Sequence, residues 1–125
     1  MGEVRELVDR YFEDLNNGCN NLISCEDLYK SIGRGDDLYI LDIRKEEDFE
    51  KEHIDGGENV FWPYVGDFLD HLPKDKKIIV VCYSGQSAGQ VVSLLRILGY
   101  DACSLKGGMN NGWKKGDLPL SSGCG

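Results

Sequence analysis

Hydrophobic residues near the N-terminus recur every three or four positions, with charged residues between them. The positions are Val4, Leu7, Val8, Tyr11, Phe12 and Leu15. This period predicts an amphipathic helix that packs one face on the body of the protein. After a polar loop at residues 16–21, Ser24 stands three residues before Asp27, which predicts the N-cap of a second helix running to about Ile32.

Further along the chain, short apolar runs alternate with charged or glycine-containing segments. They predict strands at residues 38–41, 59–61, 78–81 and 102–105, and helices at 45–52, 65–72 and 90–98. The run at 78–81 is β-branched throughout, as is typical of a central parallel strand covered on both faces. Residues 90–98 are apolar nearly all round, which predicts a well-buried helix. The alternation predicts an open α/β sheet wrapped by helices.

Length and charge narrow the class of protein. A chain of 125 residues with 41% hydrophobic residues forms one domain with a single core. The net charge of −8 disfavours nucleic acid and anionic membranes as partners. The apolar stretches are far shorter than the roughly 20 residues that span a bilayer. The N-terminus does not resemble a signal peptide, although a trimmed export signal stays an open alternative, and we expect a cytoplasmic protein.

The cysteines form an odd set without paired CxxC spacings, which disfavours a disulfide framework and a zinc site. They are Cys19, Cys25, Cys82, Cys103 and Cys124. We expect free thiols in a reducing compartment, with Cys103 in the core and Cys19 and Cys25 as bystanders. Cys124 is expected to be a solvated bystander.

Cys82 ends the predicted strand at 78–81, and a short loop leads from it into a helix that begins near Ala88. In α/β sheets such loops turn backbone N–H groups inward, and the helix N-terminus adds its positive dipole end. This arrangement stabilises a thiolate and an anionic group bonded to its sulfur. Gly85 permits a positive φ in the loop. The alternative is that Cys82 is a small apolar residue that finishes a strand.

Four blocks of sequence in register resemble the rhodanese-like family of single-domain sulfurtransferases. They are Leu41-Asp42-Ile43-Arg44 with Glu47-Asp48-Phe49, then His53-Ile54-Asp55-Gly56-Gly57-Glu58-Asn59-Val60, the loop from Cys82 to Ala88, and Leu105-Lys106-Gly107-Gly108-Met109 with Trp113 and Leu118-Pro119. The resemblance covers residues 24–120 and implies a five-stranded parallel sheet flanked by helices on both faces. Residues 1–23 then form an N-terminal helix and connection, and residues 121–125 a flexible tail.

The resemblance implies that Cys82 is the catalytic residue. It would take sulfane sulfur from thiosulfate or a persulfide, and pass it to cyanide or a thiol, with no metal or organic cofactor. The implied substrate-binding residues are Tyr83, Ser84, Gly85, Gln86, Ser87, Ala88 and Arg44. The loop carries no cation, so we expect poor affinity for thiosulfate, and a protein persulfide stays open as donor. A non-catalytic binding or thiol redox-sensing module is the alternative function. For Cys124, the alternative to a bystander is that it accepts sulfur or resolves the persulfide of Cys82 as a disulfide.

A related group of phosphatases and arsenate reductases uses a Cys-x5-Arg loop, in which the arginine clamps a tetrahedral oxyanion. Here the sixth residue after Cys82 is Ala88, which disfavours that chemistry.

Other polar and aromatic residues have structural interpretations. We expect Asp42 and Arg44 to form a buried ion pair that fixes the loop, with direct substrate contact by Arg44 as the alternative. His53 is expected to stabilise a turn rather than act as a general base, and His71 to lie on the surface. The aromatic residues either line the mouth of the site or pack; they are Trp62, Tyr64 and Trp113.

Overall fold

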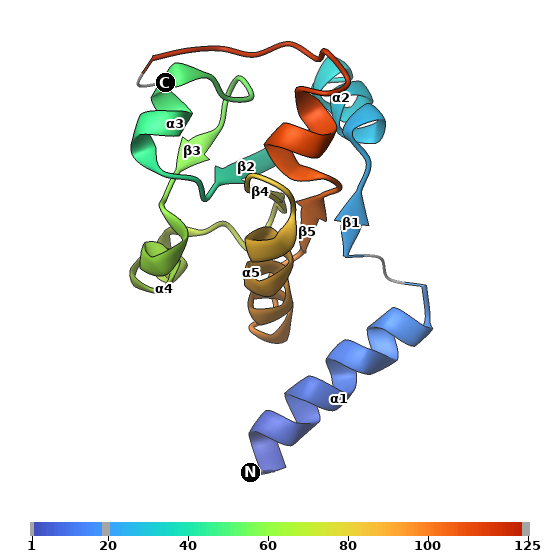
Figure 1. Cartoon of the computed structure of the whole chain (residues 1–125). Coiled ribbons are helices and arrows are strands. Elements are labelled where there is room, and N and C mark those ends of the chain that lie inside the picture. The colour runs from blue at the N-terminus through green and yellow to red at the C-terminus, as the bar shows by residue number, and fades with distance from the viewer. Residues whose placement is uncertain (1, 19–20, 124–125) are drawn as a thin grey trace.

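The computed structural model describes residues 2–18 and 21–123, and within them one parallel sheet has the strand order β1-β5-β4-β2-β3 (Figure 1). The strands are β1 (Leu22–Ile23), β2 (Leu38–Asp42), β3 (Glu58–Asn59), β4 (Lys77–Val81) and β5 (Ala102–Leu105). The α-helices are α1 (Gly2–Asn16), α2 (Cys25–Gly33), α3 (Glu46–Lys51), α4 (Val65–Phe68) and α5 (Gln86–Ile97). Trp62–Tyr64 and Leu69–His71 are 3₁₀ turns, and Gly108–Trp113 is a π-helix. The predicted fold class, a parallel α/β sheet with helices on both faces, is confirmed.

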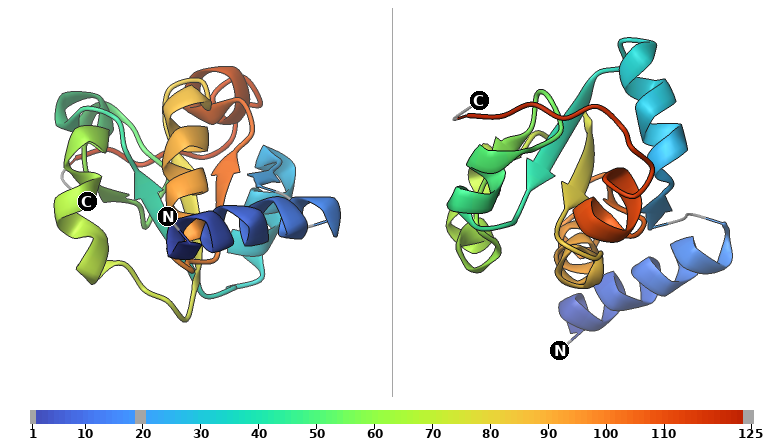
Figure 2. Two further views of the ribbon diagram at one scale, coloured as in Figure 1. Left: turned by 90° about the horizontal axis from the view of Figure 1, so that it is seen from below. Right: turned by 45° about the horizontal axis from the view of Figure 1, so that its top comes forward.

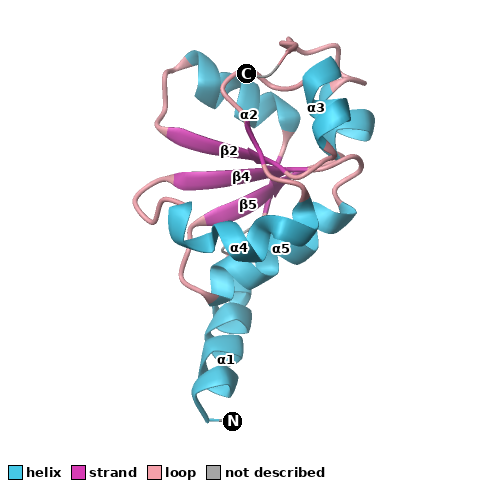
Figure 3. Cartoon of the chain, turned by 90° about the vertical axis from the view of Figure 1, so that its left-hand side faces the viewer, coloured by secondary structure: helices cyan, strands magenta, loops and turns pink. Residues whose placement is uncertain are grey.

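Helices lie on both faces of the sheet (Figure 3). The sheet separates two apolar layers, because alternate side chains of each strand point to opposite faces. On one face Ile78 and Val80 pack with residues of α4 and α5. On the other face Ile79 and Val81 pack with Leu28 of α2 and with Trp113. Burial on both faces explains the unbroken β-branched run of β4, which pairs with β2 and β5.

Helix α1 lies beside α5 at the periphery of the molecule (Figure 2). Leu7, Val8 and Tyr11 are half-buried, and the Tyr11 and Ser93 hydroxyl groups are 3.0 Å apart in a hydrogen bond. Phe12 remains 56% exposed, and α1 contains no fully buried residue. The amphipathic helix therefore forms as predicted, but it covers only part of its apolar face.

Several sequence expectations need correction. Leu94 within α5 and Leu98 directly after it are 64% and 47% exposed, because that face of the helix points away from the sheet. Since Val92 and Leu95 are buried, the predicted burial of this helix holds for one face only. The single helix expected at 65–72 is α4 continued by a 3₁₀ turn. The strand expected at 59–61 is the two-residue β3, and β1 was missed because two residues carry no periodic signal.

The N-cap of α2 is confirmed. The Ser24 hydroxyl accepts a hydrogen bond from the Asp27 N–H at 3.0 Å, which satisfies one of the free donors of the first helical turn. Across the described ranges, no helix is both long and apolar enough to cross a bilayer.

Candidate active site

The carboxyl ends of β2, β4 and β5 meet at one edge of the sheet, and Cys82 lies there directly after β4. Its side chain is only 2% exposed. The Cys82 Sγ accepts hydrogen bonds from the backbone N–H groups of Gly85 at 3.0 Å and of Ala88 at 3.4 Å. Gly85 is the N-cap of α5 and has φ 101°. This left-handed conformation, which glycine adopts without strain, lets the N–H groups of Gly85 and Ala88 point at the sulfur. The arrangement presents positive partial charge to Sγ.

The other loop residues take different positions. Among the described residues, Tyr83, Ser84, Gln86 and Ser87 make no backbone hydrogen bond to Sγ. Ser84 and Gln86 are exposed, so their side chains are available to a bound molecule. The set of amides that faces the resting sulfur is therefore narrower than the sequence suggested.

A glycine turn after β5 supports the loop from behind. The Met109 N–H donates to the Cys82 carbonyl oxygen and the Asn110 N–H donates to the Tyr83 carbonyl oxygen, each at 2.8 Å. Gly108 has φ 61°, and a Cβ atom on it would lie 2.6 Å from the Cys82 carbonyl oxygen. Only a residue without a side chain lets these two backbones approach so closely.

The π-helix Gly108–Trp113 continues from this turn. Its wider turn is marked by the Lys114 N–H, which donates to the Met109 carbonyl oxygen at 2.9 Å. Trp113 is 1% exposed, and its indole N–H donates to the Pro119 carbonyl oxygen at 2.7 Å. Trp113 therefore packs in the core instead of lining the mouth of the site.

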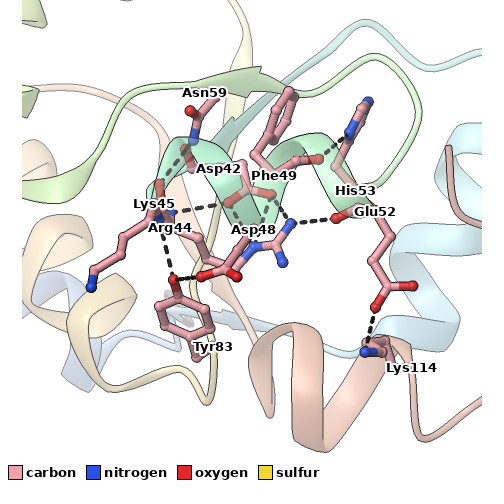
Figure 4. Close-up of polar contacts among 10 residues, drawn as sticks. All are labelled: Asp42, Arg44, Lys45, Asp48, Phe49, Glu52, His53, Asn59, Tyr83 and Lys114. Carbon is pink, nitrogen blue, oxygen red and sulfur yellow. Dashed lines mark hydrogen bonds and ion pairs between the residues drawn. The ribbon is translucent and has the colours of Figure 1, made fainter. Parts of the chain in front are cut away.

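On the opposite side of the loop, Asp42 and Arg44 form a buried ion pair (Figure 4). The Arg44 Nη2 and Nε donate to the Asp42 carboxylate at 2.8 Å and 3.0 Å. The Nη2 also donates to the Glu52 carbonyl oxygen at 2.7 Å, and Asn59 Nδ2 donates to the carbonyl oxygens of Asp42 and Arg44. Arg44 is 3% exposed and is held in place by these contacts. The predicted buried ion pair between Asp42 and Arg44 is therefore confirmed.

Tyr83 connects the loop to this polar group (Figure 4). Its hydroxyl donates to the Asp48 carboxylate and accepts a hydrogen bond from the Lys45 N–H at 3.2 Å. The Arg44 guanidinium carbon lies 6.0 Å from the centre of its ring. Burial, followed by the hydrogen bond to Asp48, raises the pKa of Tyr83 above its ordinary value, so the hydroxyl stays protonated and able to donate.

The histidines and the exposed aromatic residues lie outside these contacts. His53 is 2% exposed; its Nδ1 is 2.7 Å from the Phe49 carbonyl oxygen, and its ring stacks on Phe49. Two residues of the expected tail have backbone partners. Ser121 pairs with His53 in an isolated antiparallel bridge, and the Gly123 N–H donates to the Glu50 carbonyl oxygen. Three further residues are exposed and make none of the contacts described above, namely His71, Trp62 and Tyr64.

Three cysteines within the described ranges are free thiols. Burial raises the pKa of both the Cys25 and the Cys103 thiol, and Cys103 lies in the core as predicted. Cys25 donates to the Lys106 carbonyl oxygen at 3.6 Å. Cys19 and Cys124 lie outside the described residues. Among residues 2–18 and 21–123, no group of three His, Cys, Asp or Glu side chains could hold a metal ion.

Sequence reasoning missed three residues that support the loop or the polar group beside it, namely Asp48, Asn59 and Gly108, and it did not assign the contacts of the Tyr83 hydroxyl. A signal existed for Gly108, because two adjacent glycines after a strand indicate a close backbone approach. Asp48 and Asn59 carried no such signal, since their partners are distant in the sequence.

The fold and the site define a class of proteins, parallel α/β domains with a cysteine in an amide-lined loop. The chain belongs to the rhodanese-like domain family, whose model matches residues 24–115. It is 32% identical over 87 residues to the thiosulfate sulfurtransferase GlpE of Actinobacillus succinogenes, covering 69% of this chain and 78% of that protein. It is 26% identical to the putative sulfurtransferase YtwF of Bacillus subtilis, covering 70% and 84%.

Solved structures agree with this assignment. A rhodanese-related protein from Thermoplasma volcanium superposes with a TM-score of 0.74 at 25% identity, covering 81% of this chain and 97% of that chain. A rhodanese-like domain protein from Staphylococcus aureus superposes with a TM-score of 0.67 at 25% identity, covering 71% and 87%.

Proposed function

We propose that this protein is a rhodanese-type sulfurtransferase in which Cys82 carries sulfane sulfur as a persulfide. The observation that carries the proposal is the pair of hydrogen bonds from Gly85 and Ala88 to the Cys82 Sγ. Donors already in place stabilise the thiolate nucleophile and, one bond further out, an anionic persulfide. The relatives named as sulfurtransferases support the same chemistry.

In the loading step, the Cys82 thiolate attacks the outer sulfur of the donor. With thiosulfate, a bond forms between Sγ and the sulfane sulfur while the bond to the sulfonate sulfur breaks, and sulfite leaves with the electron pair. The negative charge of the thiolate is conserved on the outer sulfur of the new persulfide. Ser84 and Gln86 are exposed on the loop that carries Cys82.

In the unloading step, cyanide or a thiolate attacks the outer sulfur of the persulfide. The bond between that sulfur and Sγ breaks, and the electron pair returns to Cys82 as thiolate. No external oxidant or reductant is required, and no separate base is needed once the attacking thiol is ionised. The cycle suits a reducing, cytoplasmic setting, in which Cys82 returns to its reduced form.

The charge of the site bears on the donor. The loop from Tyr83 to Ala88 contains no cation, and the chain has a net charge of −8. A dianion such as thiosulfate is repelled at long range and meets no charged side chain in the loop. We therefore propose a persulfide, either small or carried by a protein, as the better donor.

The test is intact-mass spectrometry after incubation with thiosulfate and with a small persulfide. We expect a gain of one sulfur atom that cyanide removes. Cys82→Ser should show no gain, while Cys103→Ser, which removes another buried thiol, should load like wild type. An unchanged wild-type mass with every donor would refute the proposal. Oxidation of Cys82 by peroxide faster than persulfide formation would instead support the thiol redox-sensing function.

A further inference from the structure

A cavity of about 220 Å³ lies beside the Cys82 loop. Three segments line it: α3 with its flanking residues, the loop, and the π-helix with the residue after it. The lining residues include Arg44, Asp48, Lys51, Glu52, Tyr83 and Lys114. The volume is below the roughly 300–1,000 Å³ that holds drug-sized molecules, so the cavity suits a small ligand.

Most charges around the cavity already have partners. Arg44 is bound by Asp42, and the Lys114 ammonium pairs with the Glu52 carboxylate. Two charged groups differ. Within the described residues, the Lys51 ammonium forms no ion pair, and the Asp48 carboxylate has the Tyr83 hydroxyl as a neutral partner but no cation. Asp48 and Lys51 are three residues apart on α3 and so share one face of that helix.

Arg44 also lines this cavity. Arg44 is 3% exposed, and its Nε and Nη2 groups are held by Asp42 and the Glu52 carbonyl oxygen. Its Nη1 group makes no hydrogen bond within the part of the chain that the structure describes. A guanidinium nitrogen that is held in place with free N–H groups can donate to a carboxylate. The cavity lining thus offers the Lys51 ammonium and the Arg44 Nη1 group as donors and the Asp48 carboxylate as an acceptor.

We propose that this cavity binds the ammonium and carboxylate groups of a small zwitterionic thiol, of the α-amino-acid type, or its persulfide. The ammonium group pairs with Asp48, and the carboxylate pairs with Lys51 and the free Nη1 of Arg44. Thiosulfate fits this arrangement poorly, because its two negative charges meet the Asp48 carboxylate. The inference rests on the proposed function and names the substrate class of the same site.

The chemistry uses the transfer described above. As acceptor, the bound thiolate attacks the outer sulfur of the Cys82 persulfide, a new sulfur–sulfur bond forms, and Cys82 leaves as thiolate. As donor, the bound persulfide passes its outer sulfur to the Cys82 thiolate and leaves as a thiolate. The two directions are the reverse of one another, so one binding cavity serves both.

The test measures how fast three thiols discharge the preloaded Cys82 persulfide. L-Cysteine carries both charged groups, cysteamine only the ammonium group, and 3-mercaptopropionate only the carboxylate. After correction for the thiolate fraction of each, we expect L-cysteine to react about threefold faster than either of the others, since each of these lacks one of the two charged groups and a partly exposed charge pair contributes about this factor. The rate of discharge by cyanide serves as the reference, because cyanide has neither an ammonium nor a carboxylate group.

Variants assign each charge. Lys51→Gln should slow discharge by L-cysteine and by 3-mercaptopropionate about threefold and leave cysteamine unchanged. Asp48→Asn, which keeps an acceptor for the Tyr83 hydroxyl, should slow L-cysteine and cysteamine and spare 3-mercaptopropionate. Lys115→Gln is the matched control, because it removes an exposed lysine near the cavity that does not line it. Cyanide discharge should be equal in wild type and Lys115→Gln, and the thiol rates of the Lys51→Gln and Asp48→Asn proteins are divided by the cyanide rate of the same protein.

Equal corrected rates for the three thiols, or a Lys51→Gln protein that treats them as wild type does, would overturn the inference while leaving Cys82 as a sulfur carrier. Failure of wild type to load from any donor would overturn the proposed function itself. If Asp48→Asn does not fold, Lys51→Gln decides alone, since that side chain is exposed.

Discussion

The Cys82 loop is held on two sides by different kinds of interaction. Behind it, Gly108 brings backbone against backbone, and the Met109 and Asn110 N–H groups donate to the first two loop carbonyl groups. In front of it, side chains from β2 and α3 form the polar group in which Tyr83 donates to Asp48. The first support depends on the absence of a side chain, and the second depends on charges and hydrogen-bond donors.

This difference shows that one set of residues determines the shape of the loop and another set determines the charges around it. A side chain at Gly108 would displace the loop without altering any charge. Replacing Asp42 would keep the backbone contacts of the loop but would leave the buried Arg44 guanidinium without its carboxylate partner. Variants on the two sides should therefore fail in different ways.

The largest effect is expected for Asp42→Asn. It leaves the buried Arg44 guanidinium without its carboxylate and should lower the free energy of unfolding by about 3–5 kcal/mol, measured by urea denaturation. The control is Asp36→Asn, which removes an ion pair with Arg34 whose side chains are 39% and 63% exposed. That loss should be about 1 kcal/mol or less. Equal losses would show that the Asp42 pair has no special role.

Gly108→Ala should slow persulfide loading of Cys82 about 100-fold, because a displacement of the loop by about 1 Å moves the sulfur and its donors out of register. Gly35→Ala is the matched control, since Gly35 has a similar φ of 75° with nothing within 4 Å of a Cβ atom. It should cost about 1 kcal/mol of stability and leave the loading rate unchanged. Wild-type loading by Gly108→Ala would show that the rear support is dispensable.

Tyr83→Phe should have a smaller effect, destabilising the protein by about 1 kcal/mol and slowing loading of Cys82 about fivefold. Tyr100→Phe is its control, because the Tyr100 hydroxyl donates to the Leu69 carbonyl oxygen at 2.7 Å in another part of the core. Both variants should lose similar stability in urea, and only Tyr83→Phe should change the rate. A rate change of the same size in Tyr100→Phe would indicate a general loss of order.

The smallest effect is expected from alkaline pH. The pKa of Tyr83 is raised in the folded protein, chiefly by burial and then by Asp48, so its hydroxyl favours folding below its unfolded-state pKa of about 10. The stability difference between wild type and Tyr83→Phe should stay constant from about pH 7 to 9 and shrink as pH rises through the raised pKa. Urea denaturation of both proteins from about pH 7 to above the raised pKa measures this difference in stability. A difference that grows at high pH would contradict the assigned direction of the pKa shift.

Local patterns in the sequence were sufficient for much of the fold. Ser24 caps α2 because its hydroxyl reaches an N–H three residues ahead, and the β-branched run of β4 requires burial on both faces. The position of Cys82 between β4 and α5 follows from the same local signals. The Asp42–Arg44 pair was also accessible, because its two members are two residues apart.

Contacts between distant segments were not accessible from these patterns. Tyr83 and Asp48 are separated by 35 positions, and Gly108 meets Cys82 only because β5 lies next to β4 in the sheet. The choice of Gly85 and Ala88 as the amides that face the sulfur depends on the exact path of the loop. By itself, the sequence determined most of the elements and the place of Cys82 between a strand and a helix, since these depend on short-range periodicity and turn chemistry. The tertiary structure decided the surroundings of that cysteine, because strand order alone determines which remote residues reach it.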